Sequence, residues 1–523
     1  MRDGGAGVLS MRRAVTRDGW RDVYEAGERA YALALDFMHN SGWIAGAVDQ
    51  LIVDTVGVEM TLNLRPDLSR FGYDDKEASD WCSMVEGDFY RYAGNPRECD
   101  LAGKATLMEM LDGAFRHFIP GGEALLVSSF LTPQQRAAYG VTTGTKFSLV
   151  APHRLVRTTN EFDRLYQGIF HDENNRPIRY RFKERERGMD SERDITAFDG
   201  AGLPQVIHVM DRGVNPDSPR GISPLAPVMK TIAQADQLAD ATLTKALIAA
   251  NFAATITSPE QSLQAFEAIQ TLGETPMPPS FPGTDEDWRT YLGGLCQDMV
   301  DLWHVRMEAV KEGSVGLTNG SRVGHIGPGE KFEFHTPDVP GDNYLPFQKN
   351  MQREVARCLG LTYESYTGDH EGATYTSERM GGATIWPIAV RRRARIVLPL
   401  ARGVLMCWLD EQIASGRIPF KGGYRAFRAN REAVCTAVWQ GPSKPSADAY
   451  KDALTSKVKL EKGLTTLAAE YGADGKDWEQ EIEQQAREVQ RLKDLGLPNP
   501  YQAMSGGAGP NGGAADGLRE PAQ

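Results

Sequence analysis

The chain has 523 residues, a formal net charge of −12 at pH 7, 41% hydrophobic residues and 24% charged residues. This length exceeds one ordinary core, so two to four domains of a globular protein are expected. No run of 18 apolar residues occurs, so no membrane span is expected. The acidic charge argues against a protein that grips DNA with a broad basic face, although it is compatible with DNA that slides.

The two ends of the chain and the cysteines carry few signals. The first 20 residues contain no apolar h-region, so a secretory signal is not expected, and residues 1–18 are predicted to be a flexible arm. The low-complexity residues 505–523 are predicted to be disordered. Six cysteines without a CxxC pair or a zinc-like Cys/His cluster predict reduced, buried thiols.

The first part of the chain predicts helices followed by small strands, which is an α+β arrangement. The helical patterns cover residues 20–53 (with a break at Asn40-Ser41-Gly42), 76–92 and 101–118. Strand patterns cover residues 56–64, 123–129, 147–152, 166–170, 178–182 and 205–210. The mixed charged run at 183–194 is predicted to be a solvated loop or a strand edge.

A long helix is predicted from Pro224 to Ala254. Ser223 at the N-cap and Pro224 at the first helical position satisfy or remove unpaired backbone donors. Its apolar stripe is rich in alanine, which permits close approach of another helix, and by itself it also fits a core helix of a monomer. The next segment is the least legible, with helical patterns at 260–272 and 288–311 and short strands at 315–317 and 323–334.

Residues 341–416 predict a helix, an exposed loop and a long second helix. The first helix buries apolar residues that recur every four positions and ends at Gly360, a left-handed cap; the recurring residues are Phe347, Met351, Val355 and Leu359. Residues 362–376 contain no hydrophobic period long enough for a packed element. Two core helices joined by an ordinary surface connection fit the same pattern.

The second helical pattern opens at Ser377 and runs to about Ile413. Pro387 and Pro399 each remove a helical hydrogen bond, so this helix is expected to be kinked. A strand is expected at 434–439. After a linker at 442–445, charged amphipathic helices are expected at 447–471 and 478–495.

The motifs of common enzymes are absent from the sequence. It contains no G-x-x-x-x-G-K-[ST], no H-E-x-x-H and no GxSxG, so neither catalysis nor a cofactor or metal is expected. The sharpest basic feature wraps around the second helix; it consists of Arg391, Arg392, Arg393 and Arg395, with Arg402 one to two turns later. These arginines fit either solvated side chains with inter-subunit ion pairs or contacts with DNA phosphates.

Several phrases, in their order along the chain, resemble the portal proteins of tailed bacteriophages, specifically the lambda-type family. They are GGEALL, VAPHRL, VIHVMDRGVNPDSPRGISPLAPV, YLPFQKNMQREVARCLGLTYESYTGD, ATYTSERMGG and CWLDEQIASGRIP. The chain departs from the family at Thr374-Tyr375-Thr376-Ser377, where members usually read Asn-Tyr-Ser-Ser.

The resemblance implies a portal-type subunit with a mixed α/β wing, long stem helices, a small α/β clip and a helical C-terminal crown. The implied segments are the wing (19–222), a stem helix (223–257), the clip (258–340), a second stem helix (341–361), a tunnel loop (362–376), a long kinked helix with the rest of the wing (377–440) and the crown (441–504). The DNA-facing residues of the tunnel loop would be Ser365, Tyr366, Thr367, Asp369, His370, Glu371 and Thr374.

The resemblance also implies a non-enzymatic ring, dodecameric as in the family, at one capsid vertex of the virion and in the host cytoplasm during assembly. Its partners would be further copies of the chain, double-stranded DNA, the terminase large subunit, a head–tail adaptor and the major capsid or scaffold protein, with no membrane. The rival hypotheses are a DNA-processing enzyme (a nuclease or packaging ATPase subunit) and a monomeric α+β adaptor.

Overall fold

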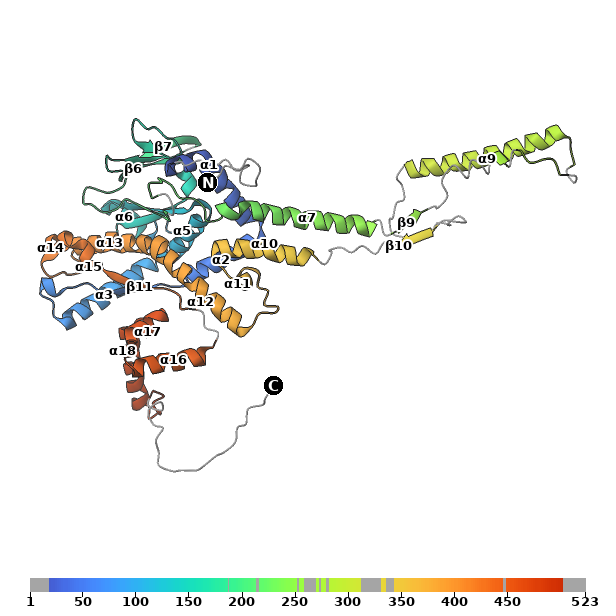
Figure 1. Cartoon of the computed structure of the whole chain (residues 1–523). Coiled ribbons are helices and arrows are strands. Elements are labelled where there is room, and N and C mark those ends of the chain that lie inside the picture. Colours follow the sequence, from blue (N-terminus) through green and yellow to red (C-terminus); the bar gives the residue numbers. More distant parts are fainter. Residues whose placement is uncertain are drawn as a thin grey trace, which may run out of the picture. The chain divides into compact units, whose positions relative to one another are not determined.

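The computed structural model describes residues 18–186, 188–212, 216–251, 254–257, 270–271, 274–278, 282–311, 331–334, 343–444 and 448–501. Contacts divide the chain into two compact units, residues 1–230 with 352–523, and residues 231–351. Helices and strands occur in both (Figure 1), so the predicted α+β class is confirmed.

The first unit begins with a group of helices. These are α1 (Gly19–Asn40), α2 (Gly42–Thr55), α3 (Asp75–Ala93), α4 (Pro96–Cys99), α5 (Leu107–Gly121) and α6 (Pro133–Tyr139), with 3-10 turns η1 (Ser69–Phe71), η2 (Pro152–Arg154) and η3 (Ala226–Val228). The predicted break between α1 and α2 is confirmed. The helix expected at 101–118 starts later, because Thr106 and Glu109 form a capping box that fixes its first turn.

Three antiparallel sheets belong to the first unit. Their strand orders are β1 (Thr61–Leu64) with β11 (Ala437–Gln440); β3 (Thr145–Val150), β2 (Glu123–Phe130) and β8 (Val206–Met210); and β4 (Leu165–Tyr166), β5 (Ile169–His171), β6 (Pro177–Glu186) and β7 (Met189–Thr196). The first pairing joins Leu62 to Trp439 from the far end of the chain. The charged run at 183–194 falls on β6 and the exposed edge strand β7, which confirms the predicted strand edge.

The helices from residue 344 onward, the first of which spans the boundary between the two units, are mostly where the periodicity predicts them. They are α10 (Tyr344–Leu359), α11 (Tyr363–Thr367), α12 (Tyr375–Arg392), α13 (Leu398–Ala414), α14 (Gly423–Ala429), α15 (Arg431–Val434), α16 (Ala449–Glu461), α17 (Leu467–Ala473) and α18 (Trp478–Asp494). Phe347, expected on the buried face of α10, is 58% exposed. The helix expected at 447–471 is divided into α16 and α17, with Gly463 left-handed (φ 67°) between them.

The long second helix is interrupted between α12 and α13. Residues Arg393–Val397 form one turn of π-helix, named η4. Pro387 lies inside α12 and Pro399 lies in the first turn of α13, where a missing N–H is tolerated. A π-helical turn is a recognised cause of helix bending.

The C-terminal half of the long helix lies at the centre of the first unit. Trp408 of α13 is 2% exposed, and its ring centroid lies 5.3 Å from that of Phe89 and 5.7 Å from that of Tyr92. Aromatic pairs at these separations add to the stabilisation from buried area. Because α13 is held in the core, α12 and the preceding loop extend from a fixed base.

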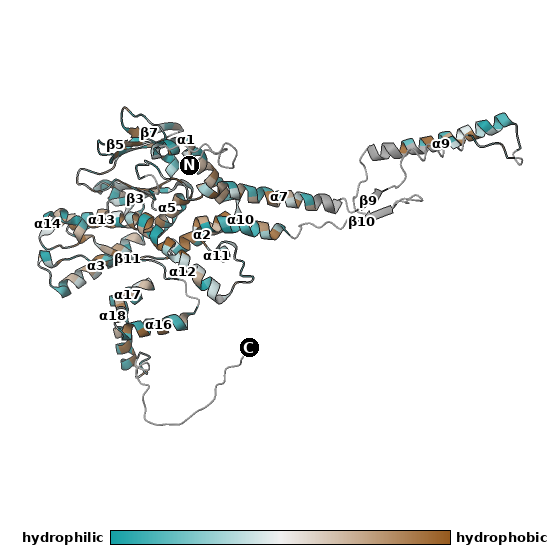
Figure 2. Cartoon of the chain, viewed as in Figure 1, coloured by the Kyte–Doolittle hydropathy of each residue, from teal (hydrophilic) through white to brown (hydrophobic). Residues whose placement is uncertain are grey.

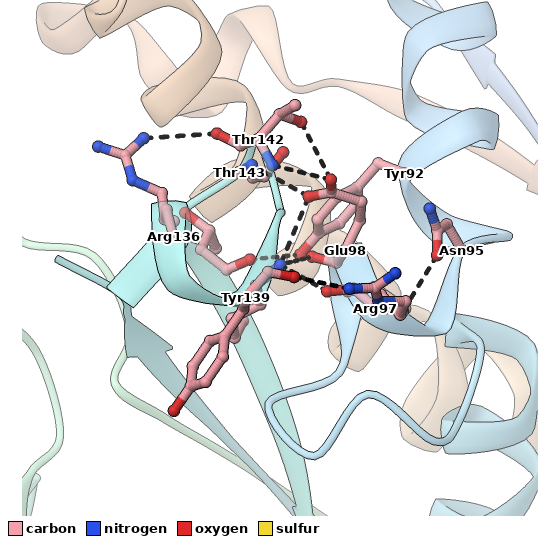
Figure 3. Close-up of polar contacts among 12 residues, drawn as sticks. Tyr92, Asn95, Arg97, Glu98, Arg136, Tyr139, Thr142 and Thr143 are labelled. Carbon is pink, nitrogen blue, oxygen red and sulfur yellow. Dashed lines mark hydrogen bonds and ion pairs between the residues drawn. The ribbon is translucent and has the colours of Figure 1, made fainter. Parts of the chain in front are cut away.

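Buried polar contacts also fix α13. Glu411 accepts hydrogen bonds from the backbone of Gly144 and Thr145, both at 2.7 Å. Next to them, Glu98 accepts from the amides of Thr142 (2.8 Å) and Thr143 (3.0 Å), as Figure 3 shows. Three segments far apart in the sequence are thereby joined, and their buried polar atoms are satisfied.

The second unit is smaller and contains α7 (Met229–Asn251), β9 (Ala254–Thr257), α9 (Asp285–Lys311) and β10 (Lys331–Phe334). The strands β9 and β10 pair antiparallel. The helix predicted from Pro224 starts instead with the 3-10 turn η3, and its expected last residue, Ala254, opens β9. The arm, the tail, residues 260–269 and the strands expected at 315–317 and 323–330 lie outside the described residues.

The helices in the described part of the chain are too short or too polar for a membrane span. Among the described residues, no helix is both long and apolar enough to cross a membrane. Figure 2 shows hydrophobic and hydrophilic residues mixed along α7 and α9.

Candidate functional site

The segment between α10 and α12 begins with a short helix that the sequence did not predict. Gly360 has φ 75°, as expected for a left-handed cap. Thr362 then caps α11 by accepting a hydrogen bond from the Ser365 amide at 3.0 Å. The turn ends at Gly368, with φ 68°, which opens the loop Gly368–Thr374.

Tyr366 attaches this short helix to the body of the subunit. Its side chain is 8% exposed, and its ring stacks on that of Trp43 in α2, with centroids 6.1 Å apart and planes at 24°. Figure 1 places α11 beside α2, and the two helices are in contact. Thr367, half-buried, donates a hydrogen bond to the Tyr363 carbonyl at 2.8 Å.

The loop beyond Gly368 presents polar side chains to solvent. His370 and Glu371 are exposed, and His370 Nδ1 lies 2.6 Å from a carboxylate oxygen of Glu378 in α12. Asp369 is half-buried and accepts hydrogen bonds from the Glu371 amide (3.0 Å) and the Tyr363 hydroxyl (3.3 Å). The loop is therefore ordered by its own side chains while its tip stays accessible.

Thr374 begins the next helix. Its side chain accepts from the Ser377 amide at 3.2 Å, while Ser377 Oγ accepts from the Thr374 amide at 3.0 Å. This reciprocal pair is a capping box. The helix accordingly starts at Tyr375, two residues before the position expected from its periodicity.

The outer arginines of the basic cluster share one carboxylate. An Arg391 nitrogen lies 3.1 Å from Asp211, and an Arg395 nitrogen lies 3.3 Å from the same side chain. Both arginines are at least half exposed, so the pairs are partly screened by solvent.

The inner arginines of the cluster donate to the ends of helices. Arg392 donates to the Leu359 carbonyl at the end of α10 at 2.5 Å. Arg393 is 8% exposed and donates to the carbonyls of Thr55 (2.7 Å) and Asp54 (3.1 Å) at the end of α2. Burial lowers the pKa of both guanidinium groups. Cations at helix C-termini satisfy carbonyls that have no partner within the helix.

A buried ionic centre that sequence reasoning missed lies just before α7. Arg220 donates to Glu123 at 2.7 Å and to the carbonyls of Pro152 (2.8 Å) and Gln167 (3.2 Å), and His208 lies 3.0 Å from Glu123. Burial opposes ionisation of Glu123, but Arg220 and His208 outweigh it and hold the pKa at about 2. The sequence offered one signal for this centre, a glutamate directly before the apolar residues 124–127 of β2.

The candidate residues thus separate into three groups. Ser365 of α11 and the loop residues His370, Glu371 and Thr374 are exposed. Tyr366 packs in the body, with Thr367 and Asp369 between these extremes. The arginine cluster lies on the same long helix as the start of α12 but has partners within the chain. Among the described residues, no group of three or more His, Cys, Asp or Glu side chains is arranged to hold a metal ion.

The sequence of the chain matches a known protein family. The family described as "Phage portal protein, lambda family" matches residues 9–393. Portal protein B of Escherichia phage lambda is 24% identical over 490 residues, which are 91% of this chain and 86% of the relative. The portal protein of Escherichia phage N15 is 24% identical over 508 residues, 93% of this chain and 90% of that relative.

Solved structures with a similar chain include the neck of an empty gene transfer agent particle computed with C6 symmetry. Its chain is 14% identical, with a TM-score of 0.40, over 94% of this chain and 98% of that one. On the match over most of its length, this chain belongs to the lambda family of phage portal proteins, and it is a portal subunit.

Proposed function

We propose that the subunit assembles into a ring, dodecameric as in its family, that lines a channel for double-stranded DNA at one capsid vertex. A terminase motor would drive DNA inward, and the ring would retain it, release it at ejection and connect head to tail. The observation that carries this proposal is the loop Gly368–Thr374, which extends exposed polar side chains between two capped helices.

The roles of the segments follow from this assembly. Residues 223–257 and 341–361 would form the stem around the channel, and residues 258–340 the clip. Residues 362–376 would form the tunnel loop, residues 19–222 and 377–440 the wing with the long kinked helix, and residues 441–504 the crown. On α7, Leu243 is 60% exposed in the single chain. A neighbouring copy in the ring would cover such a side chain.

Within the loop, the exposed residues would face DNA. His370 and Glu371 at the tip, flanked by Ser365 and Thr374, offer polar groups without a strong positive charge. Such a surface contacts phosphates weakly and lets DNA slide. Tyr366, stacked on Trp43, would hold the loop in place.

The subunit would work without catalysis, because the partner motor supplies the energy. Its partners would be further copies of itself, double-stranded DNA, the terminase large subunit, a head–tail adaptor and the major capsid or scaffold protein. It would reside at the portal vertex of the virion, and in the host cytoplasm during assembly.

Class-averaged electron micrographs of the purified protein test the ring directly, with a central pore and a countable symmetry as the expected result. A compact single-copy particle under all assembly conditions would refute the proposal. Sustained ATPase or nuclease turnover by the purified chain would instead favour the enzyme hypothesis.

The loop assignment needs a separate test. His370→Ala and Glu371→Gln are expected to change DNA packaging or retention while rings form normally. Ser415→Ala, at the far end of α13, is a matched surface control with no expected effect on packaging. If the loop variants fail to form rings, the loop contributes to assembly and does not line the channel.

A further inference from the structure

Helix α2 contacts both sides of the loop. Its first turn carries Trp43, whose ring stacks on Tyr366 of α11. Both α11 and α12, the helices that enter and leave the loop, pack against α2. Figure 1 shows these three helices close together, and Figure 2 colours much of α2 as hydrophobic.

The other end of α2 is attached to the far end of α12. Arg393 follows α12 directly and begins the π-helical turn η4. Its guanidinium, 8% exposed, donates to the carbonyls of Thr55 and Asp54, which are the last residues of α2. Since each attachment involves one end of the same helix, α2 connects α11, which precedes the loop, to the C-terminal end of α12, which follows it.

The same guanidinium also contacts the chain that leads to the C-terminal helices. Arg393 donates to the Pro442 carbonyl at 3.3 Å. A Cβ on Gly441 would lie 2.6 Å from the guanidinium carbon, so only glycine leaves room for this contact. The linker 441–444 is therefore seated on the group that attaches α2 to α12.

We propose that α2 is a brace that sets the position of the loop, with Trp43 and Arg393 as its positioning residues. Because α2 is a 14-residue helix about 21 Å long, a displacement at either end is transmitted along it. A shift of the linker 441–444 thus reaches the loop through Arg393, α2 and Trp43. The role of the loop at the DNA rests on the proposed function, whereas the brace itself does not.

Amide hydrogen exchange of the purified full-length protein, without DNA or partners, tests the brace. Trp43→Ala and Arg393→Gln are each expected to accelerate exchange across residues 363–374 at least tenfold. Amides of the β2–β3 pairing should keep their rates, because the contacts of Trp43 and Arg393 described above are with α11, the end of α2 and the linker. Arg395→Ala is the matched control, since this arginine lies two residues away and pairs with Asp211.

The decisive result comes from the distant variant. If Arg393→Gln leaves residues 363–374 unchanged while Trp43→Ala accelerates them, the stack acts locally and the brace is refuted. If both variants accelerate exchange in the β2–β3 pairing as much as in residues 363–374, the milder variants Trp43→Phe and Arg393→Lys are measured next. Equal acceleration of both regions in these milder variants overturns the proposal. A linker variant, Gly441→Ala, should accelerate the same loop amides by severalfold.

Failure of the proposed function would look different. Faster exchange of residues 363–374 in Arg393→Gln, together with normal packaging by the His370 and Glu371 variants, would support the brace and reject DNA contact by the loop. Altered packaging by the His370 and Glu371 variants, with unchanged exchange of residues 363–374 in Arg393→Gln, would support DNA contact by the loop and reject the brace.

Discussion

Glu86 of α3 lies where the C-terminal helices dock on β1, and its protonation should govern stability near neutral pH. The side chain is 5% exposed; one oxygen accepts from the Leu64 amide at 2.6 Å and the other from Gln480 of α18 at 3.5 Å. Burial raises the pKa of Glu86 to about 7, and the nearby carboxylates of Asp477 and Glu479 add to this rise.

The sign of the effect follows from the direction of the shift. A carboxyl whose pKa is raised by folding binds its proton more tightly in the folded state, so stability falls as pH rises from 4.5 to about 7. A rise from 4.5 to about 7 at 1.36 kcal/mol per pH unit corresponds to about 3 kcal/mol. Glu86→Gln imitates the neutral acid and removes this penalty.

Urea denaturation of the full chain at pH 5, 6, 7 and 8 measures the expected difference. Glu86→Gln should exceed the stability of the parent protein by less than about 1 kcal/mol at pH 5 and by up to about 3 kcal/mol at pH 8. Glu98→Gln is the control of opposite sign: burial opposes ionisation of Glu98, but the Thr142 and Thr143 amides lower its pKa overall. A stability difference for Glu86→Gln that does not vary with pH would show that the reasoning is wrong.

Three further substitutions test other parts of the fold. Glu123→Gln should destabilise the protein by about 3–5 kcal/mol at pH 7, because Arg220 is left buried without its carboxylate, and the loss should shrink as pH falls toward 2, as measured by denaturation. Gly122→Ala should cost more than about 1–2 kcal/mol, since φ is 68° and the added Cβ would overlap the Ile222 backbone; a low yield of folded protein and a lower melting temperature are expected. Thr374→Ala should cost about 1 kcal/mol through loss of the cap of α12, and Thr374→Asn should restore it, as followed by exchange of the α12 amides.

Local signals in the sequence predicted the elements that local chemistry determines. The ends of α3 and α18 follow from caps and periodicity within the helices themselves, and the left-handed Gly360 needs only its own backbone. The short helix α11 was missed because its stabilising contact, Trp43 on Tyr366, comes from a distant part of the chain.

The arginine cluster shows the same limit for the candidate site. Its composition permitted either DNA contact or ion pairing, and only the fold shows that Arg393 meets carbonyls 338 and 339 residues away. The Glu123–Arg220 pair is likewise invisible locally, because 97 residues separate its members. Contacts between distant segments depend on packing, which a single sequence read by pattern does not supply.

Asp211 decides whether the outer arginines are available to DNA. It accepts hydrogen bonds from both Arg391 and Arg395, so in the folded chain both guanidinium groups are paired with the same carboxylate. Within the proposed channel, Asp211→Asn would free two cations, each able to release one phosphate counterion. Binding of duplex DNA to assembled rings should then depend more steeply on salt, by up to about 1.8 in the slope of log K against log salt. Adding Arg391→Ala and Arg395→Ala should reverse the change. An unaltered slope in Asp211→Asn would place this cluster away from the DNA and leave it a purely structural element of the long helix.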